Sequence, residues 1–306
     1  MMGRLILAGG TGILGQLLIP SFLEKEYEII ILTRRAQRVS DDINVKYVHW
    51  DGRQSGEWIN YLDGADVLIN MSGERIDRRF TKKNKSLLEK SRIEPTRTLG
   101  EAISRLANPP AVWINFSGVS LFGGAETISD EYSQIYGRGF LPDLTEKWEK
   151  AFAQCDAPKT RKIVLRISPV LTHAGGLFAS LFPLAKWRLA GTIGSGKQYV
   201  PWVHQEDFVR LVHWLIEGEN KQGIYHACTP DVIDNRQLMQ ALRNVVGVSV
   251  GLPLPTIFAK IGAYLRGIDP SLLLETTPVV SVRLAEEGFS FKYLHIDQAL
   301  EQLVRG

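Results

Sequence analysis

Three glycines spaced three residues apart, Gly9, Gly12 and Gly15, follow the short apolar run from Leu5 to Ala8, and a helix-like segment continues to Leu23. Glycine tolerates positive φ and lets a ligand approach the backbone closely. The unpaired N–H groups at a helix start attract an anion. The stretch therefore predicts a strand, a glycine turn and a helix that bind the pyrophosphate of a dinucleotide.

The second apolar run, Glu28 to Leu32, ends in Thr33, Arg34 and Arg35. A site that prefers NAD usually has Asp or Glu at this distance from the glycines, to accept a hydrogen bond from the ribose 2′-hydroxyl. Two guanidinium groups suit a phosphate instead, because their planar donors bind it bidentately. We therefore expect NADP(H) rather than NAD(H). The alternative is that both arginines are solvated loop charges.

Apolar runs alternate with helix-like segments along the first half of the chain. Beyond the first two runs, the pattern predicts strands at 44–50, 65–71, 111–117 and 161–167, and helices at 87–106 and 144–154. Such alternation implies βαβ units. The expected fold class is α/β, a Rossmann-type doubly wound parallel sheet with a smaller, mainly helical C-terminal lobe. A ligand of such a sheet lies across the carboxyl ends of the strands.

The pattern changes after about residue 170, where glycines at 175–176 and 191–196 predict loops. Helices are expected at 208–217, 235–245 and 257–265, and a short strand at 223–227. We expect residues 1–170 to form an NADP-binding Rossmann domain, its sheet completed by a later strand near 224–227. Residues 171–306 would form a smaller substrate lobe, with 250–306 as an extra C-terminal segment.

Composition excludes several classes of protein. The net charge of +3 is too small to indicate nucleic-acid binding, and the basic run at 75–90 is either a solvated helix face or a phosphate-facing surface. Two isolated cysteines favour a reducing cytoplasm. The histidines show no metal-ligand spacing, and no apolar stretch could span a bilayer. We expect a cytoplasmic monomer or homodimer with no metal, nucleic-acid or membrane partner.

Several motifs carry a family resemblance. The segments GGTGILG, LTRR, INMSGERI, KSRIEPT, FSGVSLFGG, LRISPVL, GSGKQYVPWVHQED and GFSFKY occur in this order along nearly the whole chain. In this respect the chain resembles an atypical branch of the extended short-chain dehydrogenase/reductases, the "epimerase family" of NADP-binding proteins with a short extra C-terminal domain. Members of this branch resemble nucleotide-sugar epimerases in fold, and their substrate is generally undefined.

The resemblance implies positions for the cofactor-binding residues. It assigns the pyrophosphate turn to Gly9, Thr11, Gly12, Ile13 and Gly15, and the 2′-phosphate site to Thr33, Arg34 and Arg35. On the nicotinamide side it assigns Met71, Ser72, Gly73, Arg92, Ser117, Arg166 and Ser168.

The usual catalytic pair of this superfamily is missing. A typical reductase has Tyr-x-x-x-Lys on one helix face, which a four-residue spacing allows. Aligned on Trp148 and Glu149, this chain has Leu141 and Thr145 at those places. Phe122 also stands where relatives have an aromatic hydroxyl. The ordinary acid/base part of the site is therefore absent.

Other residues could supply the proton chemistry that hydride transfer to or from an alcohol needs. The candidates are Ser117, Glu131, Tyr132, Lys147, His204 and Glu74, and the expected substrate wall is formed by Gln198, Trp202 and His204. Each has a plainer alternative: Ser117 as a cap, Glu131 and Tyr132 as loop residues, His204 as a structural histidine and Trp202 as a packing residue.

Two functional hypotheses remain. The first is an NADP(H)-dependent oxidoreductase or nucleotide-sugar-epimerase-like enzyme, acting on a small nucleotide-linked or carbonyl-containing substrate. The second is a non-catalytic NADP(H)-binding sensor or scaffold. The missing Tyr-x-x-x-Lys pair favours the second. The nicotinamide-side segments, Met71–Gly73 and Arg166–Pro169, favour the first, because a sensor has less need of them. We favour the enzyme.

Overall fold

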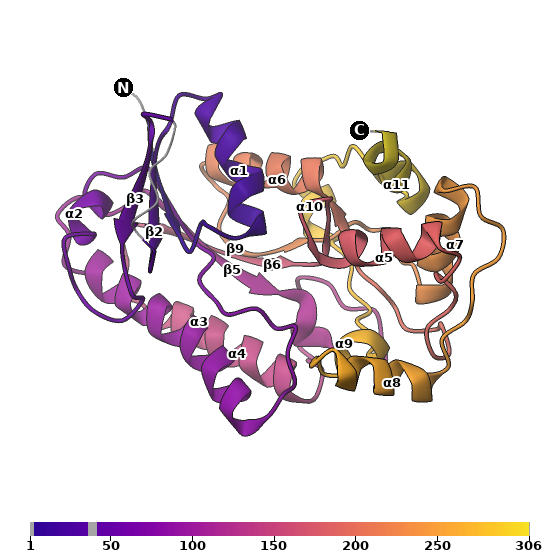
Figure 1. Cartoon of the computed structure of the whole chain (residues 1–306). Helices are drawn as coiled ribbons and strands as arrows, with labels where there is room; N and C mark the ends of the chain where they lie inside the picture. Colours follow the sequence, from indigo (N-terminus) through magenta and orange to yellow (C-terminus); the bar gives the residue numbers. More distant parts are fainter. Residues whose placement is uncertain (1–2, 36–41, 306) are drawn as a thin grey trace.

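A seven-stranded parallel sheet runs through the middle of the molecule (Figure 1). The computed structural model describes residues 3–35 and 42–305. The strand order is β3-β2-β1-β4-β5-β6-β9, with β1 at Arg4–Ala8, β2 at Glu28–Thr33, β3 at Val45–His49, β4 at Val67–Asn70, β5 at Val112–Gly118, β6 at Arg161–Ile167 and β9 at Gly223–Ala227. The predicted Rossmann-type doubly wound sheet is thus confirmed.

Helices cover both faces of the sheet, and this explains why its strands are apolar on both sides. In β1, Leu5 and Leu7 belong to one buried cluster, and Ile6 and Ala8 to the other. The first cluster includes residues of α1 (Ile13–Leu23) and α6 (Gln205–Glu217). The second includes residues of α2 (Ile59–Leu62), α3 (Lys82–Ile103) and α4 (Phe140–Ala153).

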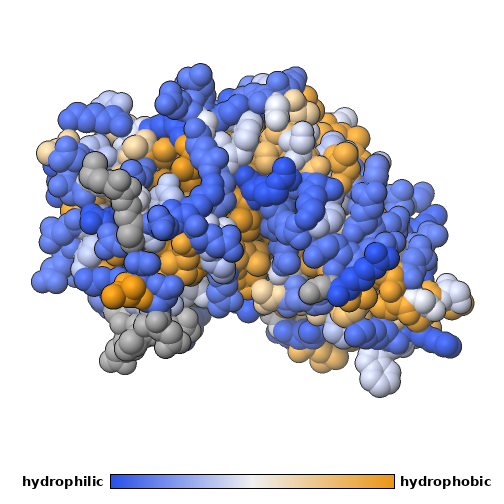
Figure 2. Space-filling model, turned by 90° about the horizontal axis from the view of Figure 1, so that it is seen from above, coloured by the Kyte–Doolittle hydropathy of each residue, from blue (hydrophilic) through white to orange (hydrophobic). Residues whose placement is uncertain are grey.

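A third cluster forms the core of the C-terminal lobe. It draws on α5 (Gly176–Lys186), α7 (Asn235–Val245) and α11 (Ile296–Arg305). The remaining elements are η1 (Val119–Phe122), β7 (Val170–Leu171) paired with β8 (Val203–His204), α8 (Thr256–Leu265), α9 (Ser271–Leu274) and α10 (Arg283–Glu286). Seen from above, the face is mostly hydrophilic, and its outline is indented between the part with β1–β3 and this lobe (Figure 2).

The sequence pattern missed parts of the helical content. α3 begins at Lys82, five residues before the expected start, because Thr81 caps it: its Oγ1 accepts from Asn84 N at 3.2 Å. The first turn of α3 is polar and charged, so apolar periodicity could not show it. α2, α5, α9, α10 and α11 were not predicted. α5 begins at Gly176, the second of the two glycines at 175–176 that we had interpreted as a loop.

A buried polar network fixes the carboxyl ends of β4 and β5 against α3 and α4. Asn70 Nδ2 donates to Thr96 Oγ1 at 3.0 Å and to Asn115 Oδ1 at 2.7 Å, while Asn70 Oδ1 accepts from Ser72 N at 3.1 Å. Trp148 Nε1 donates to the same Thr96 hydroxyl at 3.0 Å. Asn70 is fully buried. The network therefore positions the segments that follow both strands.

Replacing Asn70 tests the importance of this network. We expect Asn70→Ala to lower the free energy of unfolding by about 2–4 kcal/mol, because it leaves buried polar groups without partners. Urea denaturation followed by tryptophan fluorescence measures this loss. The exposed Asn60 provides a matched control, and Asn60→Ala should change stability by less than about 0.5 kcal/mol. Equal effects of the two changes would contradict the expectation.

Candidate functional site

The glycine turn between β1 and α1 is closely packed inside and open outside. Gly9 has φ +80°, and a Cβ there would come within 3.0 Å of Ser72 Cα; a Cβ at Gly15 would come within 2.0 Å of Gly10 O. A Cβ at Gly12 would meet nothing within 4 Å. Gly12 is the N-cap of α1, and the first turn has no acidic residue. The helix start thus presents unpaired N–H groups to an open surface, as an anion site requires.

The turn lies next to the C-terminal lobe and to the end of β4. Thr11 and Ile13 are partly exposed, and Ile13 Cδ1 lies 2.4 Å from where a Cβ on Gly175 would stand. Met71 packs against the sheet core. Ser72 Oγ is buried and has no hydrogen-bond partner among the described residues. A buried hydroxyl without a partner is costly, and its place beside Gly9 suits a polar ligand.

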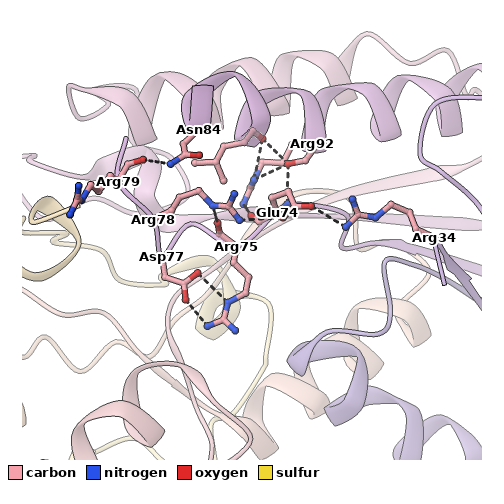
Figure 3. Close-up of polar contacts among 10 residues, drawn as sticks. Arg34, Glu74, Arg75, Asp77, Arg78, Arg79, Asn84 and Arg92 are labelled. Carbon is pink, nitrogen blue, oxygen red and sulfur yellow. Dashed lines mark hydrogen bonds and ion pairs between the residues drawn. The ribbon is translucent and has the colours of Figure 1, made fainter. Parts of the chain in front are cut away.

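Three arginines surround one carboxylate near the end of β2 (Figure 3). Arg34 Nη2 lies 3.0 Å from Glu74 Oε1, and Arg78 Nη2 lies 3.2 Å from Glu74 Oε2. Arg92 Nη2 donates to the Glu74 backbone carbonyl at 3.0 Å. The Arg34 side chain is 73% exposed. Because two guanidinium groups pair with one carboxylate and a third lies at the backbone of the same residue, the cluster carries an excess of positive charge.

Arg92 is held under this cluster by α3 and α4. Its Nη1 donates to Leu88 O at 3.1 Å, and its guanidinium lies 5.4 Å from the Trp148 ring. Burial lowers the pKa of Arg92 to about 10, although the negative charge of Glu74 acts in the opposite direction and raises this pKa. The side chain therefore stays protonated at neutral pH. A Cβ on Gly73 would stand 3.1 Å from the Arg92 guanidinium carbon, so this glycine lets the arginine approach.

The two other residues at the end of β2, Thr33 and Arg35, differ in exposure. Thr33 is buried, and its Oγ1 accepts from Arg35 N at 3.3 Å. The Arg35 side chain is exposed. Ser168 directly follows β6, on the other side of the central strands from β2. It is buried and donates to Ala227 O at 2.7 Å. Thr33 and Ser168 thus shape the backbone around the site, and Arg34 and Arg35 present charge to solvent.

A buried ionic cluster lies at the ends of β5, β6 and β9. Ser117, Arg166 and His226 are neighbours in the parallel register. Ser117 Oγ donates to Glu149 Oε1 at 2.6 Å. Arg166 binds the same carboxylate through Nε at 2.9 Å and Nη2 at 2.7 Å. Burial alone would lower the pKa of Arg166, but its hydrogen bonds and ion pair with Glu149 outweigh this and raise it.

His226 closes the cluster as a neutral imidazole. Its Nδ1 lies 2.9 Å from Val280 O, and its Nε2 lies 3.4 Å from Arg166 Nη1. A carbonyl can only accept and a guanidinium can only donate, so the proton is on Nδ1. Burial lowers the pKa of His226, although the charge of Glu131 opposes this effect. A second proton, on Nε2, would point at the positively charged guanidinium of Arg166.

Two residues of this region were missed by the sequence reasoning. Glu149 lies one helical turn after Thr145, on the face where the lysine of the usual pair was sought, and this spacing could have indicated it. Tyr136 has its ring 5.9 Å from the Arg166 guanidinium and edge-on to Phe122. Thr145 itself is buried, donates to Leu141 O at 2.8 Å and lies 3.1 Å from Ser120 Oγ.

Three of the predicted catalytic residues have other partners. The buried Glu131 carboxylate accepts from Ser281 Oγ at 2.6 Å, and from the backbone N–H groups of His226, Val282 and Arg283. Tyr132 is exposed and donates to Glu286 at 2.6 Å. Lys147 is exposed and pairs with Glu89 at 2.9 Å. Of the four residues, only Ser117 has its side chain in the Glu149–Arg166 cluster.

The three residues of the predicted substrate wall are buried in this structure. Trp202 and His204 are fully buried, and Gln198 is nearly so. Gln198 Nε2 donates to two backbone carbonyls, and His204 Nδ1 caps α6 by accepting from Glu206 N at 3.2 Å. Burial lowers the pKa of His204, against the charge of Glu206. Trp202 and His204 therefore stabilise the lobe, and Gln198 is held by the backbone carbonyls of Ile193 and Leu273.

Comparison with known proteins gives a consistent result. The family model described as "NAD dependent epimerase/dehydratase family" matches residues 5–138. An epimerase family protein of Staphylococcus haemolyticus is 27% identical over 99% of both chains. The structure of the human epimerase family protein SDR39U1 with NADPH is 25% identical, with a TM-score of 0.86 over 99% of both chains.

A structure of MoeE5 with UDP-glucuronic acid and NAD has a TM-score of 0.77 over 99% of both chains, at 15% identity, and so shares the fold. The motifs, the sheet and the full-length match agree with one another. The chain is thus similar over nearly its whole length to epimerase family proteins, and its residues 5–138 match the NAD dependent epimerase/dehydratase family, in agreement with the resemblance that the sequence motifs had indicated.

Proposed function

We propose that this protein binds NADP(H) and transfers hydride to or from a nucleotide-linked or carbonyl-containing substrate, with Ser117 and Glu149 as its acid/base pair. The observation that carries the proposal is the Ser117–Glu149–Arg166 cluster at the carboxyl ends of β5 and β6. Ligands of doubly wound sheets lie across these strand ends. In this proposal residues 1–170 hold the cofactor, and the substrate lies toward residues 171–306.

The fit of a dinucleotide rests on three features. Gly12 leaves open space over the start of α1, Ser72 Oγ is a buried hydroxyl without a described partner, and the arginines around Glu74 carry excess positive charge. The open space over the start of α1 would receive the pyrophosphate. The arginines around Glu74 would receive the 2′-phosphate, with Arg34 as the exposed donor. The NADPH in the structure of the human relative agrees with this preference.

The acid/base step needs only residues of this chain. The nicotinamide supplies the hydride acceptor or donor. In the oxidative direction Ser117 Oγ takes the proton of the substrate hydroxyl while its own proton passes to Glu149, 2.6 Å away. The fork from Arg166 holds this carboxylate in place. In the reductive direction the two protons move back, so the oxygen is protonated as the hydride arrives.

The second function, a non-catalytic NADP(H)-binding sensor or scaffold, has an observation in its favour. Leu141 and Thr145 stand in place of the usual pair, and Thr145 is buried and hydrogen-bonded within its helix. Turnover separates the two functions, because a sensor binds cofactor tightly and converts no substrate.

Arg34 is the residue on which cofactor preference depends. We expect Arg34→Ala to weaken NADPH binding by about 1.5–3 kcal/mol, the contribution of a charge-assisted hydrogen bond, and to leave NADH binding nearly unchanged. Isothermal titration calorimetry measures both affinities. Arg105→Ala, an exposed arginine at the end of α3, is the control. An equal loss for NADPH and NADH would show that Arg34 does not bind the 2′-phosphate.

Ser117 and Glu149 are tested by turnover. We expect Ser117→Ala and Glu149→Gln each to lower kcat for NADPH oxidation, across a library of carbonyl and nucleotide-sugar substrates, by about 10²–10⁴-fold. NADPH affinity should stay unchanged, since neither side chain is placed at the phosphates. Lys147→Ala, an exposed residue on the same helix, should keep full activity. Tight NADPH binding by the unaltered protein without any turnover would favour the sensor.

A further inference from the structure

α8 packs onto the lobe with its small residues and presents its large apolar residues to solvent. Ala259 and Ala263 are buried, whereas Ile257, Phe258, Ile261, Tyr264 and Leu265 are between 49% and 77% exposed. At 100° per residue these five side chains fall on one outward stripe of the helix. Amphipathic helices of globular proteins are normally oriented the other way. The outward stripe of α8 is thus an unusual apolar surface.

Further exposed apolar side chains lie in the segment that leads into α8 and in the turn beside that segment. Trp187 is 77% exposed, and Leu189, Val250 and Leu252 are also exposed. Leu252 N donates to Arg188 O at 2.8 Å, so the turn at 187–189 and the loop at 250–254 lie side by side. We call these four side chains and the stripe of α8 the apolar rim.

The apolar rim is fixed to the body of the protein at both ends of α8. Leu254 N donates to Thr192 O at 2.9 Å just before the helix begins. Near its end, the Arg79 guanidinium stacks 3.6 Å from the centre of the Tyr264 ring. The rim is therefore a defined surface of the fold.

The segments that carry the rim are basic and contain no acidic residue. Residues 174–204 include Lys186, Arg188 and Lys197, and residues 235–268 include Arg236, Arg243, Lys260 and Arg266. All seven except the half-buried Arg243 are exposed. The next acidic residue along the chain, Asp269, accepts from Ser271 and from Phe80 N. The chain segments that form the apolar rim therefore carry an excess of positive charge.

We propose that the apolar rim is a docking surface for an anionic phospholipid bilayer. A second copy of the chain fits less well, because an isologous interface would bring the same basic segments face to face. A bilayer of anionic lipids matches both the positive charge and the exposed apolar side chains of the rim. Its headgroups attract Lys and Arg, and its interface accepts exposed Trp, Tyr, Phe, Ile and Leu.

This surface contact differs from a membrane span. Among residues 3–35 and 42–305, no helix combines the length and the apolar composition needed to cross a bilayer. The sequence argument against a membrane partner considered membrane spans only. A helix lying in the interface needs just one apolar face and basic neighbours, both of which α8 and its surroundings provide.

Co-sedimentation of the full chain with vesicles tests the proposal. We expect it to bind vesicles of equal parts phosphatidylglycerol and phosphatidylcholine, at least tenfold more tightly than pure phosphatidylcholine. The triple variant Ile257→Ser, Phe258→Ser, Leu265→Ser should lose binding by tenfold or more. Its control is Ile43→Ser, Ile135→Ser, which removes two exposed apolar side chains elsewhere and should bind as the unaltered protein does.

A second variant tests the charges and guards against misfolding of the first. Arg188→Gln, Lys260→Gln, Arg266→Gln should weaken binding to the anionic vesicles by tenfold or more, and thermal unfolding and NADPH binding should stay unchanged in both variants. Absence of binding by the unaltered protein, or equal binding by the triple serine variant, overturns the proposal. The proposal is also overturned if the unaltered protein binds no vesicles and light scattering shows a dimer that the serine variant does not form. A second copy would then cover the rim.

Discussion

The buried guanidinium of Arg166 constrains everything around it. It is 1% exposed, and an ionised group out of water is unfavourable unless it is paired and hydrogen-bonded. Glu149 meets this requirement with both carboxylate oxygens. To do so, α4 must lie with this residue over the ends of β5 and β6, which brings the Ser117 hydroxyl within 2.6 Å. The geometry of the proposed acid/base pair thus follows from the pairing of one arginine.

The arginine cluster at Glu74 has the opposite balance. At Arg166 one carboxylate compensates one buried guanidinium, and the pair is complete. At Glu74 one carboxylate faces Arg34, Arg78 and, through its backbone, Arg92. Arg34 is largely exposed, so its charge is available to a ligand. The two clusters lie at the ends of strands of one sheet, one closed and the other open, as expected of a catalytic end and an anion-binding end of one site.

Much of this arrangement could be predicted from the sequence. The glycine spacing and the apolar runs predicted the strands of a doubly wound parallel sheet, and the residues at the carboxyl ends of these strands include Arg34, Ser72 and Ser117. Local patterns could not give the partners. Glu149 served only to align the helix: its four-residue spacing from Thr145 places it on the relevant face, but the helix pattern does not show that its carboxylate pairs with a buried arginine in the next strand, β6. Trp202 and His204 stand in a distinctive motif, but their burial depends on the packing of α11 and α6.

α8 illustrates the same limit in a different way. Its composition predicted a helix at 257–265, and the structure has one at Thr256–Leu265. Periodicity gives the face on which apolar residues gather, and the usual inference is that this face points inward. Here close packing decides otherwise: Ala259 and Ala263 let the helix approach the lobe, and its bulky residues are left outside. An outward apolar stripe costs solubility, so a fold that fixes it at both ends, on segments with seven basic residues, has a surface better explained by binding than by packing.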